Sequence, residues 1–352
     1  MSDRISGRDY IQLRDFLSRE FGLFFEPSKV TFLENRLLPL LAEMRLESLN
    51  DMISCVRTDF FWRGRFLDAL TTNETWFFRH PRHFDILRED ILPALVRERA
   101  KSRRREIEIW SAGCSIGAEA CSIAITMHEV LQDAPDWSLR IIGSDVSPQA
   151  ITRAHEGIYT GSEVRLLSGL LLNRYFMPVD DNNYKIKPEL QNLITYEIRN
   201  LLEEPWPDRE FDVIFCRNTM IYFKDETKAK LTERFYKALR TGGIFIPGAT
   251  ETIHWVGNNE FEREFIRGEY IYRKRMGNNE YILYQFVTSS DLLRALNILV
   301  KEHFEYRLQT ITQMSHTSPK KALIVPIRFI DRVERLFSDA LLKPLLRENV
   351  SQ

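Results

Sequence analysis

A strand-like segment at residues 107–112 runs into a loop bounded by Gly113 and Gly117, and a helix-like segment follows. In a parallel sheet such a loop lies at the carboxyl ends of the strands, where these folds bind ligands. The Gly-x-x-x-Gly spacing fits neither the GxGxxG dinucleotide pattern nor the GxxxxGK[ST] P-loop, so phosphate is a poor candidate ligand. The loop also matches GxSxG, the nucleophile elbow of α/β-hydrolases, with Ser115 as the nucleophile. A hydrolase would further need an acid and a histidine, and the candidate histidines are His254, His303 and His316.

A second candidate ligand-binding residue is Asp145, which ends the strand-like segment 139–145 about 30 residues beyond the glycine loop. An acidic side chain at this place can accept hydrogen bonds from ribose hydroxyls. A glycine loop with an acidic strand end and no phosphate cradle fits a nucleoside without phosphates, such as S-adenosylmethionine (SAM). The alternative is that Asp145 caps the helix whose start Ser147 and Pro148 signal.

The segments that must position these residues alternate in type from residue 107 onward. Helix-like stretches end near Leu131 and Leu239, and they separate strand-like runs at 107–112, 139–145, 193–198, 211–216 and 243–249. This alternation predicts an α/β fold with a mostly parallel sheet and helices on both faces. The runs 261–266 and 269–274 flank Gly268 and predict a closing antiparallel hairpin.

Three further regions depart from this alternation. The first 70 residues carry apolar side chains at helical spacing, which predicts a small helical domain. Residues 174–190 contain two short extended runs around an Asp-Asp-Asn-Asn turn, which predicts a small hairpin that projects from the α/β domain. Beyond residue 276, helices are predicted at 291–304 and 329–346, and the apolar run 320–327 is a doubtful strand because of Pro326.

The composition limits the class of protein. A length of 352 residues predicts two or three domains at ~150 residues each. An apolar share of 44% and a charged share of 28% exclude a disordered or collagen-like chain. Four scattered cysteines without a CxxC pair argue against a disulfide framework and a zinc site, so no metal is expected.

Charge and hydropathy bear on location and partners. The 49 Lys and Arg residues nearly balance the 50 Asp and Glu residues, which argues against a globally basic nucleic-acid binder. The one dense basic run, residues 97–106, is interpreted as a solvated helix end and loop, with nucleic-acid or membrane binding as the alternative. No apolar signal core begins the chain and no run of about 18 apolar residues occurs, so we expect a cytoplasmic location without membrane insertion.

Several segments together resemble one known family. They are TTNETWFFRHPRHFDIL (71–87), IWSAGCSIGAEACSIAI (109–125), GSDVS (143–147) with AHEGIY (154–159), NLLEEP (200–205), FDVIFCRNTMIYF (211–223) and GGIFIPGATET (242–252). In order and spacing these segments resemble the CheR chemotaxis-receptor methyltransferases, over roughly residues 5–275. The resemblance implies SAM-dependent methylation of glutamate side chains on receptor helices.

The resemblance also implies an architecture. It predicts an all-α receptor-recognition domain at residues 1–72 and a class I, Rossmann-like SAM-methyltransferase domain at 73–276. A small β-subdomain is inserted near 174–190, and an extension of unknown role covers 277–352. The oligomeric state stays open.

Matched residue by residue, the resemblance implies a SAM pocket whose product state holds S-adenosylhomocysteine (SAH). The implied catalytic residues are Arg79 and Tyr222, for which a surface ion pair and core packing are the respective alternatives. Lys29 and Arg36 of the helical domain are expected to bind the receptor substrate. The implied SAM-contacting residues are Asn73, Thr75, Arg79, Gly113, Glu119, Asp145, Asn200, Leu201, Asn218 and Thr219.

Two departures from the family pattern favour an alternative. The family motif GEEPYS is GAEACS here, at residues 117–122, and only its second acid is kept, as Glu119. The helical domain keeps Lys29 and Arg36, but Pro39, Leu40 and Ala42 stand where more charge is common in the family. The alternative is therefore a SAM- or SAH-binding signalling scaffold with weak or no catalytic activity.

The chemistry of glutamate methylation sets modest demands on the protein. The acceptor carboxylate has a reference pKa of about 4.3 and is ionised at neutral pH, so no general base is needed. Catalysis then depends on alignment of the carboxylate with the donor methyl group. Arg79 is expected to orient the carboxylate, and Tyr222 to shape the methyl slot or donate a hydrogen bond. The edge of the hairpin at 174–190 is a candidate site for a tethering receptor peptide.

Overall fold

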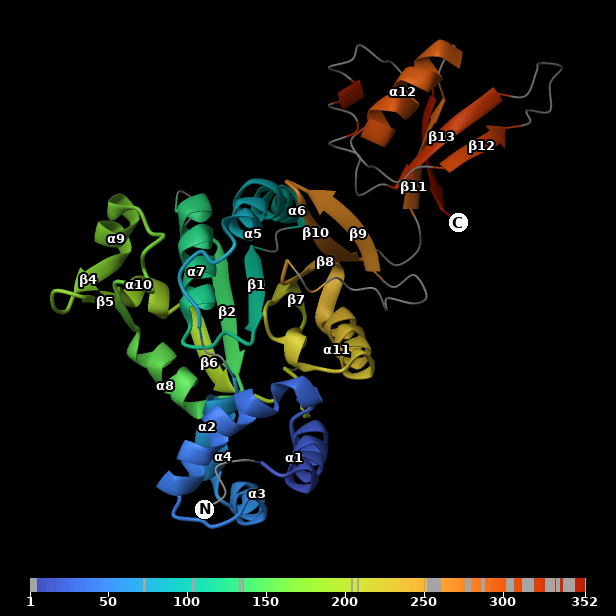
Figure 1. Cartoon of the computed structure of the whole chain (residues 1–352). Coiled ribbons are helices and arrows are strands. Elements are labelled where there is room, and N and C mark those ends of the chain that lie inside the picture. Colours follow the sequence, from blue (N-terminus) through green and yellow to red (C-terminus); the bar gives the residue numbers. More distant parts are fainter. Residues whose placement is uncertain are drawn as a thin grey trace. The chain divides into compact units, whose positions relative to one another are not determined.

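The structure is a computed structural model, shown in Figure 1. It divides into two compact units, Met1–Lys274 and Arg275–Gln352, which are described separately. The described residues are 5–71, 74–102, 105–132, 134, 136–203, 205–207, 209–249, 251, 261–275, 280–285, 289–301, 307–311, 320–326, 333, 336–337 and 346–351.

The first unit begins with the predicted all-α domain. Its elements are α1 (Gly7–Glu20), η1 (Pro27–Lys29), α2 (Val30–Glu43), α3 (Leu49–Thr58) and α4 (Phe60–Leu70). Three of the helices begin at residues whose side chains accept a hydrogen bond from the first turn: Ser6 for α1, Ser48 for α3 and Asp59 for α4. Leucine and phenylalanine side chains from all four helices form one buried core.

A seven-stranded sheet follows, in the order β6-β2-β1-β7-β8-β10-β9. Parallel strands form its larger part: β1 (Glu106–Ala112), β2 (Ser138–Asp145), β6 (Ile194–Ile198), β7 (Phe211–Cys216) and β8 (Leu239–Pro247). The hairpin of β9 (Phe261–Ile266) and β10 (Glu269–Lys274) completes it, and β10 runs antiparallel to β8. The predicted α/β sheet and its closing hairpin are confirmed.

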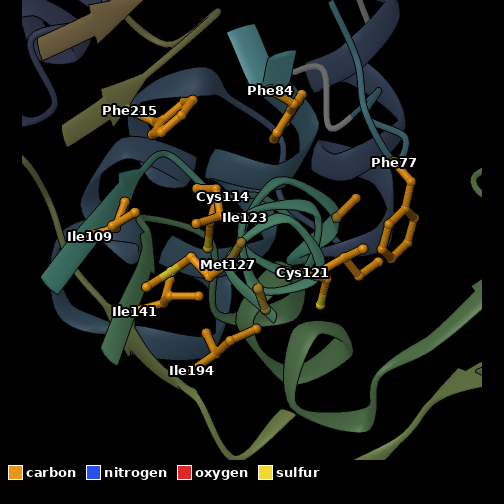
Figure 2. Close-up of a cluster of buried hydrophobic side chains, with 14 of the residues drawn as sticks. Phe77, Phe84, Ile109, Cys114, Cys121, Ile123, Met127, Ile141, Ile194 and Phe215 are labelled. Atoms are coloured by element: carbon orange, nitrogen blue, oxygen red, sulfur yellow. The ribbon is translucent and has the colours of Figure 1, made fainter. Parts of the chain in front are cut away.

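Helices cover both faces of this sheet, as Figure 1 shows. They are α5 (Pro81–Ile86), η2 (Leu87–Ile91), α6 (Leu92–Ser102), α7 (Ala118–Leu131), α8 (Pro148–Glu156) and α11 (Asp225–Ala238), with the short η3 (Met220–Tyr222). Neighbouring residues of β1 point to opposite faces and enter different cores. Ile109 packs in the cluster that contains Ile123 of α7 (Figure 2), and Trp110 packs with Phe235 of α11. Burial on both faces explains why β1 is apolar without alternation.

The inserted subdomain is larger than predicted. Its antiparallel sheet has the order β3-β5-β4, formed by β3 (Ile158–Thr160), β5 (Asn183–Ile186) and β4 (Phe176–Pro178). Two helices accompany it, α9 (Gly169–Tyr175) and α10 (Pro188–Gln191). The predicted hairpin is present as β4 and β5. Its first run is shorter than expected because Arg174 and Tyr175 end α9, which Ser168 caps.

The second unit contains an antiparallel sheet in the order β12-β13-β11-β14. Its elements are β11 (Glu280–Gln285), α12 (Ser289–Lys301), β12 (Arg307–Ile311), β13 (Lys320–Pro326) and β14 (Leu346–Ser351). The helix predicted at 291–304 is described as far as Lys301, and the doubtful strand at 320–327 is β13. Of the helix predicted at 329–346, Val333, Leu336 and Phe337 are helical, but its end is wrong because Leu346 begins β14. Among the described residues, the strand order is that of a ferredoxin-like unit.

The basic run 97–106 spans the end of α6 and the start of β1, as predicted, but one of its members is not solvated. Arg99 is 8% exposed and forms an ion pair with Asp212 of β7. Asp212 also accepts a hydrogen bond of 2.7 Å from Arg240. Arg99 is therefore part of a buried charge network with Asp212 and Arg240. Within the described part of the chain, no helix has the length and apolar character needed to cross a membrane.

Candidate active site

A cavity lies at the carboxyl ends of β1, β2 and β7, and the all-α domain supplies part of its wall. The cavity encloses about 1180 Å³, including the space open to solvent. The described residues that line it are Phe21, Leu23, Leu67, Thr71, Glu74, Thr75, Trp76, Arg79, Phe84, Gly113, Cys114, Ser115, Glu119, Asp145, Val146, Arg199, Asn200, Leu201, Arg217, Asn218, Thr219, Ile221, Tyr222 and Phe223. The cavity thus gathers, from five separate segments, every SAM-contacting residue named above that the structure describes. Asn73 lies outside the described residues.

The glycine loop follows β1 and turns tightly at the floor of this cavity. Gly113 and Gly117 both have φ of +87°, a conformation that L side chains rarely adopt. The backbone N–H groups of Gly113 and Cys114 donate to the Ser144 carbonyl at 2.7 and 2.9 Å. A Cβ on Gly113 would lie 2.1 Å from Thr219 Oγ1, so position 113 has no room for a side chain.

Ser115 does not form the catalytic pair that a hydrolase would need. Its Oγ is buried and has no hydrogen-bond partner among the described residues. His254, His303 and His316 lie outside the described residues. A GxSxG match therefore finds no structural support in the part of the chain that is described.

Asp145 ends β2 and both of its carboxylate oxygens face backbone donors. Oδ2 accepts from Ser115 N–H at 2.9 Å and Oδ1 accepts from Ser147 N–H at 3.0 Å. Burial raises the pKa of the Asp145 carboxyl, and the two backbone hydrogen bonds oppose that rise. The cap of α8 is Ser147, whose Oγ accepts from Ala150 N–H at 2.9 Å. The interpretation of Asp145 as a helix cap is therefore wrong.

Glu119 projects from the first turn of α7 toward the end of β7. Its Oε1 accepts from the Ser111 hydroxyl at 2.7 Å, and its Oε2 accepts from Arg217 Nη1 at 3.0 Å. Arg217 also donates to the Arg79 carbonyl, and its guanidinium lies 5.5 Å from the Phe84 ring centroid. In the sequence, Arg217 stands within the segment FDVIFCRNTMIYF, where no local pattern predicts a role for it. It connects the segments that carry Glu119 and Arg79.

Arg79 lies in the loop before α5, beside Trp76. Its Nη1 donates to the Glu74 carbonyl at 2.8 Å, and its Cζ is 4.9 Å from the Trp76 ring centroid. The Nε of Arg79 is buried without a hydrogen-bond partner among the described residues. The described contacts of Arg79 are thus to a carbonyl and a ring, and not the surface ion pair considered as the alternative.

The comparison with known proteins agrees with this site. Residues 73–268 match the family profile "CheR methyltransferase, SAM binding domain", and residues 8–71 match "CheR methyltransferase, all-alpha domain". The chain belongs to the CheR methyltransferase family. It is therefore a SAM-dependent methyltransferase, and the hydrolase interpretation is wrong.

Individual relatives have the same assignment. A chemotaxis protein methyltransferase of Borreliella burgdorferi is 32% identical over 246 residues, which are 69% of this chain and 86% of that protein. One of Vibrio anguillarum is 34% identical over 259 residues, 71% of this chain and 90% of its own length. A SAM-bound magnesium protoporphyrin IX methyltransferase structure from Synechocystis covers 90% of this chain and 96% of its own, with 11% identity and a TM-score of 0.27, too low to support an argument.

The residues of this CheR-family site fit SAM. Three residues that line the cavity each carry a buried polar atom without a described partner: Ser115 Oγ, Arg79 Nε and Arg217 Nε. Buried polar atoms are usually hydrogen-bonded, so these orphans favour a polar ligand in the cavity. Apolar walls from Phe21, Leu23 and Leu67 can take the nucleoside base.

The departure from the family motif GEEPYS does not reach the cavity lining. Ala118, Ala120 and Cys121 are at most 1% exposed, and none of them borders the cavity. The Cys121 thiol instead contacts the Tyr159 and Tyr196 hydroxyls at 3.3 and 3.4 Å. Glu119, the acid that the chain keeps, is the member of this motif that lines the cavity.

The remaining expected SAM-contacting residues and Tyr222 also line the cavity. Asn200 Oδ1 accepts from Leu202 N–H at 3.0 Å, and Leu201 is buried at 6% exposure. Asn218 has φ of +58° after β7, and its N–H donates to Glu251 Oε2 at 2.8 Å. Thr219, Thr75 and Tyr222 border the cavity directly, although the Tyr222 ring also lies 6.5 Å from that of Phe25.

Glu251 is a further residue that sequence reasoning missed, although it stands in the quoted GATET segment. Its carboxylate accepts N–H bonds from Asn218 and Gly248 at 2.8 Å and from Ile221 at 3.0 Å. Burial raises the pKa of the Glu251 carboxyl. These bonds hold the turn after β7, and with it Tyr222, against the end of β8.

The two expected substrate-binding residues lie outside the cavity. Lys29 borders a groove beside it, whereas Arg36 borders neither and lies 5.6 Å from the Phe32 ring centroid. The groove is lined by Phe24, Phe25, Glu26, Lys29, Phe32, Ile221, Tyr222, Phe223, Lys224, Asp225, Glu226 and Lys228. Cavity and groove share Ile221, Tyr222 and Phe223.

Proposed function

We propose that this chain transfers the methyl group of SAM to glutamate side chains on the cytoplasmic helices of a chemoreceptor, forming methyl esters. The observation that carries the proposal is the shared wall of the cavity and the groove. Tyr222 borders both, so an acceptor side chain that enters from the groove can reach the cavity that Arg79 also lines. The relatives' designation as chemotaxis protein methyltransferases supports the same substrate class and a cytoplasmic location.

The residues divide the work according to their positions. When bound, SAM supplies an electrophilic methyl group on a sulfonium sulfur. Asp145 and Glu119 offer acceptors to the hydroxyl and amino groups of the donor, and Arg217 holds Glu119 in place. Arg79 presents donors to the acceptor carboxylate, and its guanidinium lies 4.9 Å from the Trp76 ring centroid.

No proton has to be removed from the acceptor, because a glutamate with a pKa of about 4.3 is already ionised at neutral pH. Among the described residues that line the cavity there is no histidine, in keeping with this. Alignment of the two reactants in the cavity supplies the rate enhancement, and such alignment lowers a barrier by ~7–11 kcal/mol in the best cases.

The receptor helix is proposed to occupy the groove. The phenylalanine side chains of the groove offer an apolar surface. The lysines of the groove are balanced in number by Glu26, Asp225 and Glu226, and Lys228 pairs with Asp225 at 3.1 Å. Lys29 and Lys224 are therefore the lysines proposed to meet a glutamate-rich helix. Arg36 lies outside the groove on α2, one helical turn after Phe32, whose ring its guanidinium approaches. Lys29→Glu and Arg36→Glu should raise KM for a receptor fragment and weaken the salt dependence of KM, without altering SAH affinity.

A tethering peptide of the receptor is proposed to add a strand to the inserted subdomain. Because β5 has a strand on either side, the outer strand of the hairpin is β4, where Met177 is 40% exposed and the following Val179 52%. A deletion of 179–185 would remove part of the central strand β5, so a point change is the sharper test. Met177→Asp should weaken receptor binding, whereas Phe265→Asp on β9 should not.

The decisive experiment incubates the purified protein with methyl-radiolabelled SAM and a receptor cytoplasmic fragment. Radioactivity should appear on the fragment and be released as methanol by mild alkali, which cleaves esters and spares N-methyl groups. A fragment whose acceptor glutamates are changed to alanine should take up none. Binding of SAH without transfer to any receptor fragment would refute the proposal and favour the SAM-binding scaffold.

A further inference from the structure

The all-α domain contacts the SAM domain at Ser147, two residues after Asp145. Asp68 of α4 is half-buried, and its Oδ1 accepts a hydrogen bond from the Ser147 hydroxyl. One turn earlier in α4, Gly64 faces the start of α8, where a Cβ would lie 3.1 Å from Pro148 Cγ. The absence of a side chain at Gly64 therefore allows α4 to approach the loop between β2 and α8 closely.

Ser147 makes four hydrogen bonds that leave it little freedom, and one of them is the helix bond that its carbonyl accepts from Ile151 N–H at 3.2 Å. Its hydroxyl donates to Asp68 and accepts from Ala150 N–H at 2.9 Å, which caps α8. Its backbone N–H donates to Asp145 Oδ1 at 3.0 Å. Ser147 is fully buried, so no solvent replaces a partner that is lost. The Asp68 carboxylate thus orients the Ser147 hydroxyl, and the Ser147 N–H in turn orients the Asp145 carboxylate.

The same part of α4 reaches the cavity. Leu67, next to Asp68, lines the cavity together with Thr71, and Val146 between Asp145 and Ser147 lines it from the other side. Val146 packs against the core of the all-α domain. Asp68 itself does not border the cavity, and the hydrogen bonds that link it to Asp145 run through Ser147.

We propose that Asp68 is a positioning residue for the nucleoside end of the SAM pocket, acting through Ser147 on Asp145. The all-α domain then serves donor binding as well as receptor recognition. This inference rests on the proposed role of Asp145 in holding the ribose. Loss of the Asp68 carboxylate lets the Ser147 hydroxyl and the following turn reorient, and Asp145 loses its single orientation toward the donor.

The test is calorimetric titration of the full chain with SAH, together with methylation kinetics. Asp68→Ala should raise the Kd for SAH and the KM for SAM about tenfold, the lower end of the range for one hydrogen bond to a charged group, and leave kcat within about twofold. Asp68→Asn should bind within about threefold of wild type, because the amide oxygen can accept the same bond. Asp15→Ala, at an exposed aspartate of α1 paired with Arg14, is the matched control and should bind SAH as wild type does.

A double-mutant cycle separates this role from a general loss of stability. In a Ser147→Ala background, Asp68→Ala should cause no further loss of SAH affinity, since the bond it would remove is already absent. An unchanged Kd in Asp68→Ala, or the same tenfold loss in the Ser147→Ala background, would overturn the inference. If the wild-type chain binds SAH but methylates no receptor fragment, the proposed function fails while this inference stands on the Kd values alone.

Discussion

Replacement of Arg79 by alanine should separate methyl transfer from folding. In the structure the Arg79 side chain makes two described contacts: Nη1 to the Glu74 carbonyl at 2.8 Å, and the guanidinium over Trp76 at 4.9 Å. One such hydrogen bond and one partly exposed cation–π contact together contribute about 1–2 kcal/mol to stability. For a unit of this size that loss lowers the Tm by about 2–8 °C.

The loss in transfer should be larger. A charge-assisted hydrogen bond from Arg79 to the acceptor carboxylate is worth about 1.5–3 kcal/mol, so its removal lowers kcat/KM by about 10- to 150-fold. Arg79→Lys should fall between wild type and alanine, because an ammonium keeps the charge but not the planar pair of donors.

Arg165 provides the matched control. Its guanidinium lies 3.9 Å from the same Trp76 ring, and its Nη1 donates to the Ser162 carbonyl at 2.6 Å, but it does not border the cavity. Arg165→Ala should therefore cost about the same 1–2 kcal/mol of stability while leaving the transfer rate within about twofold. The assay is initial-rate transfer of radiolabelled methyl to a receptor fragment, with thermal unfolding of each variant. Equal kcat/KM in the two alanine variants would refute the assignment of Arg79 to the acceptor.

Three further predictions follow from the site and its support. Burial raises the pKa of Asp145, so the folded chain keeps a proton on this carboxyl at pH values where the unfolded chain has lost it. Acidification through that window should favour the folded state of the free protein but weaken SAH binding, measured by calorimetry. Asp145→Asn should abolish the pH dependence of the Kd for SAH. A wild-type Kd that does not change with pH would contradict this prediction. Gly113→Ala must place a Cβ at positive φ and 2.1 Å from Thr219 Oγ1, so it should abolish SAH binding and lower the Tm, while Gly169→Ala, whose Cβ meets nothing within 4 Å, should do neither. Asp212→Ala leaves the buried Arg99 and Arg240 without their shared partner and should lower the free energy of unfolding in denaturant by about 3–5 kcal/mol. Asp136→Ala, in an exposed pair with Arg105, should lower it by less than about 1 kcal/mol. Similar losses in the two variants would argue against burial as the cause.

Much of the fold followed from local patterns. The helical spacing of apolar residues in the first 70 positions and the buried strands at 107–112 and 211–216 predicted elements that the structure contains, because periodicity reflects which faces are buried. The segment 158–160 escaped prediction because three residues are too few to show a period, and it forms a strand only by pairing with β5. The true start of β14 was missed for a related reason, since its pairing with β11 decides where it begins. Helix α9 was missed although Ser168, a local signal, caps its start.

By itself the sequence determined the class of ligand and the chemistry. A glycine loop without a phosphate pattern, an acid at the end of the second strand and the family's motifs predicted a SAM pocket at the carboxyl edge of a parallel sheet. What a single side chain does there depends on atoms far away along the chain. Only the tertiary structure joined Arg217 to Glu119, 98 positions apart, and Ser147 to Asp68, 79 positions apart. Such contacts leave no local pattern, because a hydrogen bond depends on distance in space and not on spacing in sequence.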